Sequence, residues 1–329
     1  MKWIEVITEA QYLTVVQEIA ARQEVVDMWW SLSAGEQSRV AVKLLVRPAQ
    51  AQMVVDELYG VLGSNGRIVI LNAEAVLPLE EDDEKKIKKS SKLATREELY
   101  NGIEQGAQLD GNFILLTVLS TVVASIGLVT DNVAVVIGAM VIAPLLGPNL
   151  AFALGSALGD GVLAGKALRV SLAGLTVAGV LSFLIGRVWP LAIQSQEIMS
   201  RTDVGLDSIA LALASGAAAA LSVTTGLSSV LVGVMVAVAL LPPVASAGML
   251  AGGGHTDLAL NASLLLAVNI VCVNLSANIV FLSKGVRPRT WFAREKARQS
   301  MTMYILFWIV SLSLLAWVIF SRGKYVFQS

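Results

Sequence analysis

The chain has 329 residues, of which 55% are hydrophobic, with 24 Lys/Arg, 25 Asp/Glu and a formal net charge of −1. Charge is unevenly distributed, because residues 1–110 hold 18 Asp/Glu and 12 Lys/Arg whereas residues 111–329 hold 7 and 12. A soluble domain needs charged side chains over its whole surface, so the repeated apolar stretches of about 20 residues in the second part indicate a lipid bilayer. The acidic first part argues against nucleic acid as a partner.

Residues 1–80 are predicted to form a small cytoplasmic α+β domain. The N-terminus lacks the basic and apolar regions of a signal peptide, so the domain is expected to stay inside the cell. The order β-α-β-β-α-β predicts a ferredoxin-like sandwich, whose regulatory, self-pairing or purely structural role stays open. Strand patterns cover 2–8, 25–33, 39–47 and 67–75, helical patterns cover 11–21 and 48–61, and Ala34–Glu36 is a hairpin signal.

Residues 81–110 are predicted to form a charged linker followed by an amphipathic helix. An acidic block and then a basic block fill Glu80–Lys92. Thr95 and Glu98 have the spacing of a capping box, which opens a helix. Leu99, Ile103 and Ala107 then form its apolar face.

Seven apolar segments of the second part are predicted to span the membrane. The basic residues gather at 81–110, 159–167 and 284–301, which the positive-inside rule places in the cytoplasm. We therefore expect a multi-pass α-helical protein of the cell inner membrane, with its N-terminus inside and its C-terminus outside. The expected spans are 112–130, 132–158, 168–188, 207–225, 228–250, 259–283 and 302–320.

The membrane part contains an internal repeat. Residues 135–148, VVIGAMVIAPLLGP, and residues 230–243, VLVGVMVAVALLPP, are identical at 7 of 14 positions at an offset of 95. Each copy holds three spans, so the second copy is expected to be inverted relative to the first. The predicted divisions are repeat 1 at 111–189, an outer loop at 190–205, repeat 2 at 206–284, and a basic cytoplasmic loop, last span and tail at 285–329.

Proline and glycine are predicted to break the second span of each repeat. A proline inside a helix removes a backbone donor, and broken helices at matching positions of two inverted halves indicate a transport site at the membrane midplane. Helix N-termini at a break suit an anion, and helix C-termini suit a cation. Proline kinks that only shape packing are the alternative, and the asparagines can equally hold helices together. The predicted solute-binding residues are Pro144, Gly147, Pro148, Asn149, Pro242, Pro243, Asn274, Asn278, Asn132 and Thr225. Asp131 is expected to be a helix N-cap at the membrane interface.

Catalysis, metal binding and cofactors are not expected. The chain has one histidine, His255, and one cysteine, Cys272, and it shows no nucleophile–base pair, metal-ligand cluster or phosphate loop. No predicted span carries a charged residue near its middle, which argues against proton coupling.

Residues 130–148, TDNVAVVIGAMVIAPLLGP, resemble the signature of the prokaryotic "uncharacterized hydrophobic protein" family, domain of unknown function 389. The resemblance extends over residues 111–285, and the N-terminal domain is similar to those that precede it in family members. It implies a multispan membrane protein and brings no established activity.

The leading hypothesis is a secondary or passive transporter for a small solute, with an anion favoured, and with a regulatory or oligomerising cytoplasmic domain. An ion channel is one alternative. The other is a non-transporting membrane sensor or scaffold whose N-terminal domain binds a ligand. A homo-oligomer is expected, because small domains of this type pair and small-residue helix faces pack closely.

Overall fold

The computed structural model describes the chain except residues 33–38, 74–94, 190–194, 226–228, 287–290 and 327–329. The chain forms two compact units, Met1–Leu99 and Tyr100–Ser329. The predicted linker block Glu80–Lys92 and hairpin turn Ala34–Glu36 lie outside the described residues.

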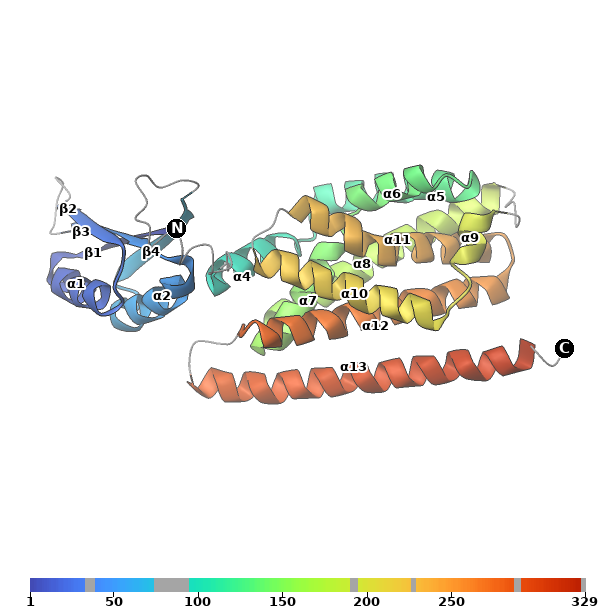
Figure 1. The fold of residues 1–329 in the computed structure, drawn as a ribbon. Coiled ribbons are helices and arrows are strands. Elements are labelled where there is room, and N and C mark those ends of the chain that lie inside the picture. The colour runs from blue at the N-terminus through green and yellow to red at the C-terminus, as the bar shows by residue number, and fades with distance from the viewer. Residues whose placement is uncertain (33–38, 74–94, 190–194, 226–228, 287–290, 327–329) are drawn as a thin grey trace, which may run out of the picture. The chain divides into compact units, whose positions relative to one another are not determined.

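The first unit is an antiparallel four-stranded sheet with two helices. Its strands lie in the order β2-β3-β1-β4, so β1 and β3 are the central strands, and buried residues alternate with half-buried ones along β1 because one face of the sheet is covered. The predicted order of strands and helices is confirmed (Figure 1). The elements are β1 (Lys2–Glu9), η1 (Ala10–Tyr12), α1 (Leu13–Arg22), β2 (Asp27–Leu32), β3 (Arg39–Val46), α2 (Pro48–Leu62) and β4 (Gly66–Asn72).

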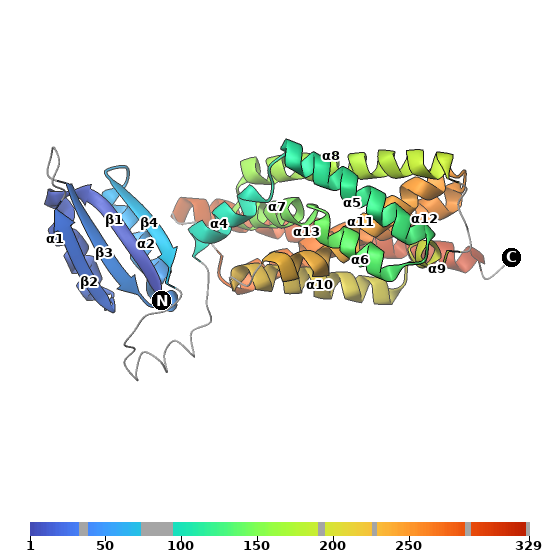
Figure 2. The same ribbon diagram turned by 90° about the horizontal axis from the view of Figure 1, so that it is seen from above.

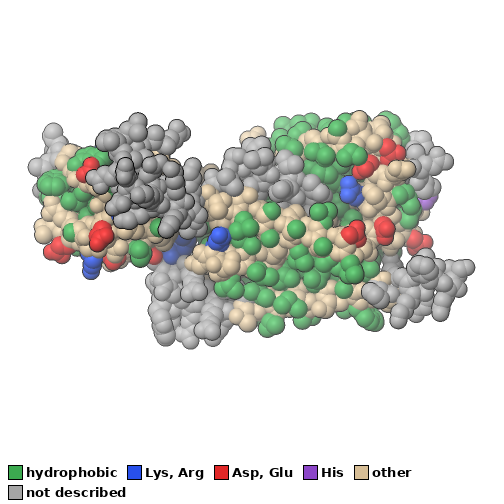
Figure 3. Space-filling view, in the orientation of Figure 1, with side chains coloured by type: hydrophobic (Ala, Val, Ile, Leu, Met, Phe, Trp, Pro, Cys, Tyr) green, Lys and Arg blue, Asp and Glu red, His purple; other side chains and the backbone are tan. Residues whose placement is uncertain are grey.

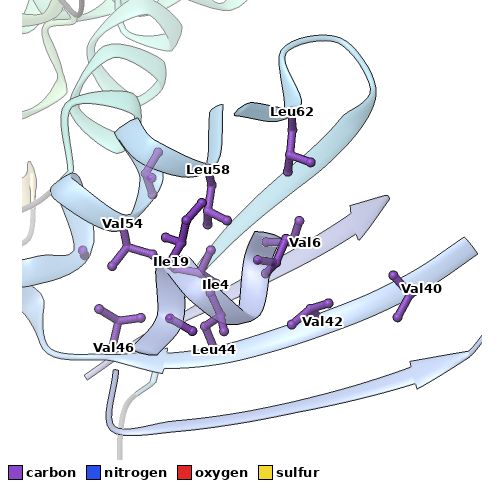
Figure 4. Close-up of a cluster of buried hydrophobic side chains, with 14 residues drawn as sticks. Ile4, Val6, Ile19, Val40, Val42, Leu44, Val46, Val54, Leu58 and Leu62 are labelled. Atoms are coloured by element: carbon purple, nitrogen blue, oxygen red, sulfur yellow. The ribbon is translucent and has the colours of Figure 1, made fainter. Parts of the chain in front are cut away.

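One face of this sheet and the two helices enclose the core of the first unit. Ile4 of β1 pairs with Leu44 of β3 and is fully buried, as is Leu58 of α2 (Figure 4). Pro48 opens α2, where its missing N–H costs no hydrogen bond, and Gly63 ends it with a φ of 52°.

A capping box opens α4 (Arg96–Gln105), as predicted. The Thr95 backbone N–H donates to Glu98 Oε2 at 2.7 Å, and Lys2 Nζ donates to the same oxygen. Burial raises the pKa of Glu98, but the hydrogen bonds from Lys2 and Thr95 outweigh it and lower the pKa below its ordinary value. Leu99, Ile103 and Ala107 are buried, which confirms the predicted apolar face.

The second unit is a helical bundle. Among the described residues, five helices are long and apolar enough to cross a membrane, or six if the bent pair α6–α7 is one span. Figure 3 shows this face of the bundle covered largely by hydrophobic side chains. The chain is therefore a multi-pass membrane protein. The helices are α5 (Gly111–Val129), α6 (Val133–Ile142), α7 (Leu146–Leu158), α8 (Gly161–Val188), α9 (Gln196–Ser200), α10 (Leu206–Thr224), α11 (Ser229–Gly252), α12 (Thr256–Ser283) and α13 (Trp291–Val326).

Helix boundaries recur at the offset of 95 residues. Both α5 and α10 have 19 residues, and α10 begins 95 positions after α5. Both α8 and α12 have 28 residues, again 95 positions apart. Gly159 and Gly254, which precede α8 and α12, have positive φ values of 68° and 87°.

Helices α5 and α10 run in opposite directions. Ser195, just before α9, places its Oγ 2.6 Å from the Leu128 carbonyl oxygen near the end of α5, and α10 starts soon after α9. Figure 1 shows α5 running toward α9 and α10 running away from it, while Figure 2 shows α8 and α10 on opposite sides of the bundle. We call the end where α5, α8 and α11 terminate the α9 end, and the end where α7, α10 and α12 terminate the Asp160 end.

Three helices differ from the predicted spans. Helix α8 begins at Gly161 instead of residue 168, and α13 extends the last span in both directions. The predicted break at Pro242 and Pro243 is wrong, because α11 runs through both prolines. Proline fits helical φ values, and prolines are tolerated in membrane helices that are buried in protein, as Leu240, Leu241 and Ala245 of α11 are.

Glycines bring the backbones of α8 and α11 together. A Cβ at Gly186 would collide with the Met249 backbone, and one at Gly248 would lie 2.6 Å from the Gly179 carbonyl oxygen. Gly252 meets Phe183 in the same way. This contact was not predicted from the sequence, although Gly248-x-x-x-Gly252 is a small-residue pattern typical of close membrane-helix pairs.

Candidate functional site at the broken helix

The first predicted break is confirmed and is three residues long. Helix α6 ends at Ile142, α7 begins at Leu146, and their axes differ by 53°. Ala143 is extended, with φ −66° and ψ 124°. Pro144 has no N–H, so the carbonyl oxygen of the buried Met140 lacks its helical donor.

Gly147 and Pro148 lie inside the first turn of α7 rather than in the break. Proline is tolerated there, because the first N–H groups of a helix have no partner within it. A Cβ at Gly147 would collide with the Gly106 carbonyl group. Glycine is therefore required at position 147 for the chain after α4 to lie against α7, whereas a Cβ at Gly106 would make a tight contact of 3.3 Å with Gly147 Cα.

Residues 100–107 are fastened to the bundle beside the break. Tyr100 Oη donates to Asp160 Oδ2 at 2.9 Å, and Lys166 Nζ lies 3.3 Å from Glu104 Oε1. Burial and the hydrogen bond to the Asp160 carboxylate raise the pKa of Tyr100 to about 12, so the phenol stays protonated and can donate. The Asp160 carboxylate also caps α8, accepting from the Val162 and Leu163 N–H groups.

Three buried asparagines form the polar centre of the bundle. Asn274 Nδ2 of α12 donates to Asn149 Oδ1 of α7 at 3.4 Å and to the Ile270 carbonyl oxygen at 2.8 Å. Asn278 Nδ2 donates to the Asn274 carbonyl oxygen at 2.9 Å, and Asn149 Nδ2 donates to that of Leu145 at 2.9 Å. The structure thus brings together three of the predicted site residues, next to the break.

The asparagine cluster lies well away from the Asp160 end of the bundle. Asn149 and Asn274 are each nine residues from the end of their helix at the Asp160 end. At about 1.5 Å per residue this is about 14 Å. Half of a hydrocarbon core of about 30 Å is nearly the same distance. Helix α12 is also central in the bundle, since 72% of its most apolar 18-residue segment is buried, against 6% for that of α13.

Several buried polar atoms of the bundle have no hydrogen-bond partner among the described residues. In an apolar interior such an atom costs about 1–3 kcal/mol unless another group satisfies it. In a sequence, a serine within an apolar span cannot be told from a small packing residue. The asparagines were therefore predicted as site residues and the serines were not. The atoms are Ser125 Oγ, Ser182 Oγ, Ser246 Oγ, Asn274 Oδ1, Asn278 Oδ1 and Trp308 Nε1.

The other predicted site residues make no recorded hydrogen bond with the cluster among the described residues. Pro242 and Pro243 are buried within α11. Asn132 is exposed and caps α6, accepting from the Val135 N–H, and Thr225 donates to the Leu221 carbonyl oxygen of its own helix. A role of these four residues in solute binding stays a prediction.

Asp131 caps a helix other than the one expected. Its Oδ1 accepts from the Glu197 N–H of α9 at 2.9 Å and lies 2.7 Å from Ser195 Oγ, while Asn132 caps α6. These hydrogen bonds, first that from the Glu197 backbone and then that from Ser195, lower the pKa of Asp131. A positive φ of 52° turns Asp131 toward α9, which the spacing along the chain does not reveal.

The described residues hold no cluster of three or more His, Cys, Asp or Glu placed to bind a metal ion. Cys272 is buried as a free thiol in α12.

Comparison with known proteins places the chain in a family. An uncharacterized protein of Methanocaldococcus jannaschii is 37% identical over 272 residues, which cover 82% of this chain and 83% of that protein. The profile of the family described as "Domain of unknown function (DUF389)" matches residues 140–275. This chain belongs to the DUF389 family. The matched segment of the DUF389 protein contains the break and Asn274, and the resemblance of residues 130–148 is thereby confirmed. No solved structure matches the chain.

Proposed function

We propose that this DUF389 protein is a membrane transporter, secondary or passive, for a small solute that binds between the first turn of α7 and α12. One observation carries the proposal. A broken helix lies next to buried asparagines of the central helix, at midplane depth, and two of their amide oxygens are unpartnered among the described residues. Irregular backbone at membrane depth is tolerated where it lines a solute path, and transporters use such breaks as binding sites.

The proposed architecture is seven spans built from two inverted repeats. The identical lengths of α5 and α10 and of α8 and α12, their offset of 95, and their opposite directions support it. Helix α11 supplies the span equivalent to α6–α7, because its 24 residues reach about 36 Å. Only one of the two corresponding spans is divided into two helices, which fits a transporter whose halves exchange shapes as the site opens to either side.

The first unit is proposed to be a ferredoxin-like domain in the cytoplasm. Its strand order β2-β3-β1-β4, with both helices on one face, supports this classification. A regulatory or oligomerising role for it is part of the proposal, and the N-terminus inside and C-terminus outside follow from the basic segments.

The test is a flux assay on purified protein in liposomes. Gradients of small anions, carboxylates, monovalent cations and protonated amines are applied to wild type, Asn149→Ala, Pro148→Ala with Pro243→Ala, and Ser276→Ala. Ser276 is a matched control, because its buried hydroxyl donates within its own helix to the Cys272 or Val273 carbonyl oxygen. Flux in the wild type and the control that falls at least about tenfold in Asn149→Ala supports the proposal, since that loss corresponds to about 1.4 kcal/mol.

If correctly inserted protein shows no flux for any solute tested, the transport hypothesis is excluded and the sensor or scaffold hypothesis is favoured. Ohmic currents without coupling would instead identify a channel. The described middle portions of α5, α8, α10 and α12 carry no charged side chain for proton coupling, which supports a passive pathway.

A further inference from the structure

We propose that the buried amide oxygens of Asn274 and Asn278 bind a monovalent cation, with Asn149 holding Asn274 in position. The inference rests on the proposed function, since it assigns a solute class to the same site, and it replaces the anion that the sequence favoured.

The hydrogen bonds of the three amides decide the kind of ligand. Each Nδ2 group of Asn149, Asn274 and Asn278 already donates to an oxygen of the protein. The Oδ1 atoms of Asn274 and Asn278 receive no donor from the described residues, although both side chains are at least 98% buried. The two wholly unpartnered polar atoms of the cluster are therefore acceptors, whereas every Nδ2 group has at least one partner in the protein.

The backbone at the break provides negative electrostatic potential at one helix end and positive electrostatic potential at the other. The C-terminus of α6 presents carbonyl groups, including the undonated one of Met140, and the N-terminus of α7 presents N–H groups. Pro148 removes one of those N–H groups. Since the expectation of an anion depended on helix N-termini alone, the unpartnered amide oxygens shift the preference to a cation.

The two helices that carry the asparagines have no charged residue near them, and this sets the valence. Helix α7 has no charged residue, and the only one of α12 is Asp257, 17 residues and about 26 Å from Asn274. Calcium and magnesium are usually held by carboxylates, whereas neutral carbonyl-type oxygens replace the hydration shell of sodium or potassium. A monovalent metal ion or ammonium therefore fits this site.

The test is the thermal unfolding of the purified full-length protein in detergent. Sodium, potassium and ammonium chloride are compared with choline chloride at equal ionic strength. At least one of the three small cations is expected to raise the apparent Tm by about 3 °C at about five times its Kd, and the individual salts distinguish metal ions from ammonium. Replacement of chloride by gluconate should leave this shift unchanged.

Three variants assign the shift to the asparagines. Asn274→Leu and Asn278→Leu keep the number and branching of the side-chain heavy atoms, remove the oxygen, and should abolish the cation-dependent shift, whereas Ser276→Ala should retain it. Asn278→Asp keeps the shape and provides a test if the leucine variants do not fold. Its cation-dependent shift should grow as the pH rises, because the carboxylate must lose its proton to bind the ion.

Equal Tm values in all four chloride salts, or a shift that persists in both leucine variants, would overturn the cation site and leave a buried water as the partner of the two oxygens. A cation-dependent Tm shift without any flux in liposomes would support the cation site and exclude the proposed transport function. Anion flux without a cation-dependent Tm shift would support the proposed transport function and exclude the cation site.

Discussion

At Gly186 the backbones of α8 and α11 lie in contact, and any side chain there must push the two helices apart. A Cβ at Gly186 would collide with the Met249 backbone, whereas one at Gly165 of the same helix would meet no atom within 4 Å. We expect Gly186→Ala to destabilise the bundle by about 1–3 kcal/mol through overpacking. Gly165→Ala is the matched control and should be neutral or stabilise it by up to about 1 kcal/mol. Apparent Tm in detergent measures both, and equal values for the two variants would contradict the contact.

Glu98 should make the stability of the first unit depend on acid pH. Its folded pKa is lowered below the ordinary 4.5, so its contribution is fully present above that pH and is lost as the pH falls through the folded pKa. Glu98→Gln should cost about 1 kcal/mol near pH 7, as loss of a capping partner does. The difference from wild type should shrink below about pH 4.5. Proteolysis of residues 1–99 in increasing urea measures it, and a difference independent of pH would refute the capping role.

At the scale of elements, we expect the hydrogen bond between the Tyr100 and Asp160 side chains to hold residues 100–107 against the bundle. Tyr100→Phe removes the donor to Asp160 and should cost about 1–2 kcal/mol, because the bond reaches a carboxylate. Hydrogen exchange of residues 100–107 should then accelerate about tenfold or more. Tyr59→Phe is a control at an exposed tyrosine of α2 in the other unit, where no acceleration in residues 100–107 is expected. Unchanged exchange in Tyr100→Phe would mean that other contacts hold this segment.

Sequence patterns predicted the elements better than their contacts. The strands of the first unit follow from alternation along segments such as 2–8, and the break follows from Pro144, because both signals are local. The pair at Pro242 and Pro243 carries the same local signal, yet packing around Leu240 and Leu241 keeps α11 helical. Local chemistry therefore cannot decide whether a proline breaks a buried helix.

The sequence predicted which residues belong to the site, but not how they are arranged in space. Asn149 and Asn274 were predicted because an amide in an apolar span is costly, but their contact joins positions 125 apart and depends on how α7 and α12 pack. Gly106 and Gly147 likewise reveal their purpose only when the two backbones are in contact. A homo-oligomer and the absence of enzymatic activity stay predictions.

For the whole molecule, the proposed inverted repeat makes a prediction that neither single helix makes. Gly161 and Thr256 are the first residues of α8 and α12, 95 positions apart, and inversion requires them to face opposite sides of the membrane. In a background with the buried Cys272 replaced by alanine, we expect a membrane-impermeant maleimide to label Thr256→Cys from outside intact cells. Gly161→Cys should be labelled only after the membrane is opened, because the basic segments place the Asp160 end inside.

Two further positions control for accessibility. Thr202→Cys lies after α9 and should behave like Thr256→Cys, whereas Lys284→Cys lies after α12 and should behave like Gly161→Cys. Labelling of Gly161→Cys and Thr256→Cys from the same side would refute the inversion. Labelling of each pair from the side opposite to that expected would preserve the inversion and reverse the orientation, since the repeat fixes the relation between the two ends and the basic residues alone fix which end is inside.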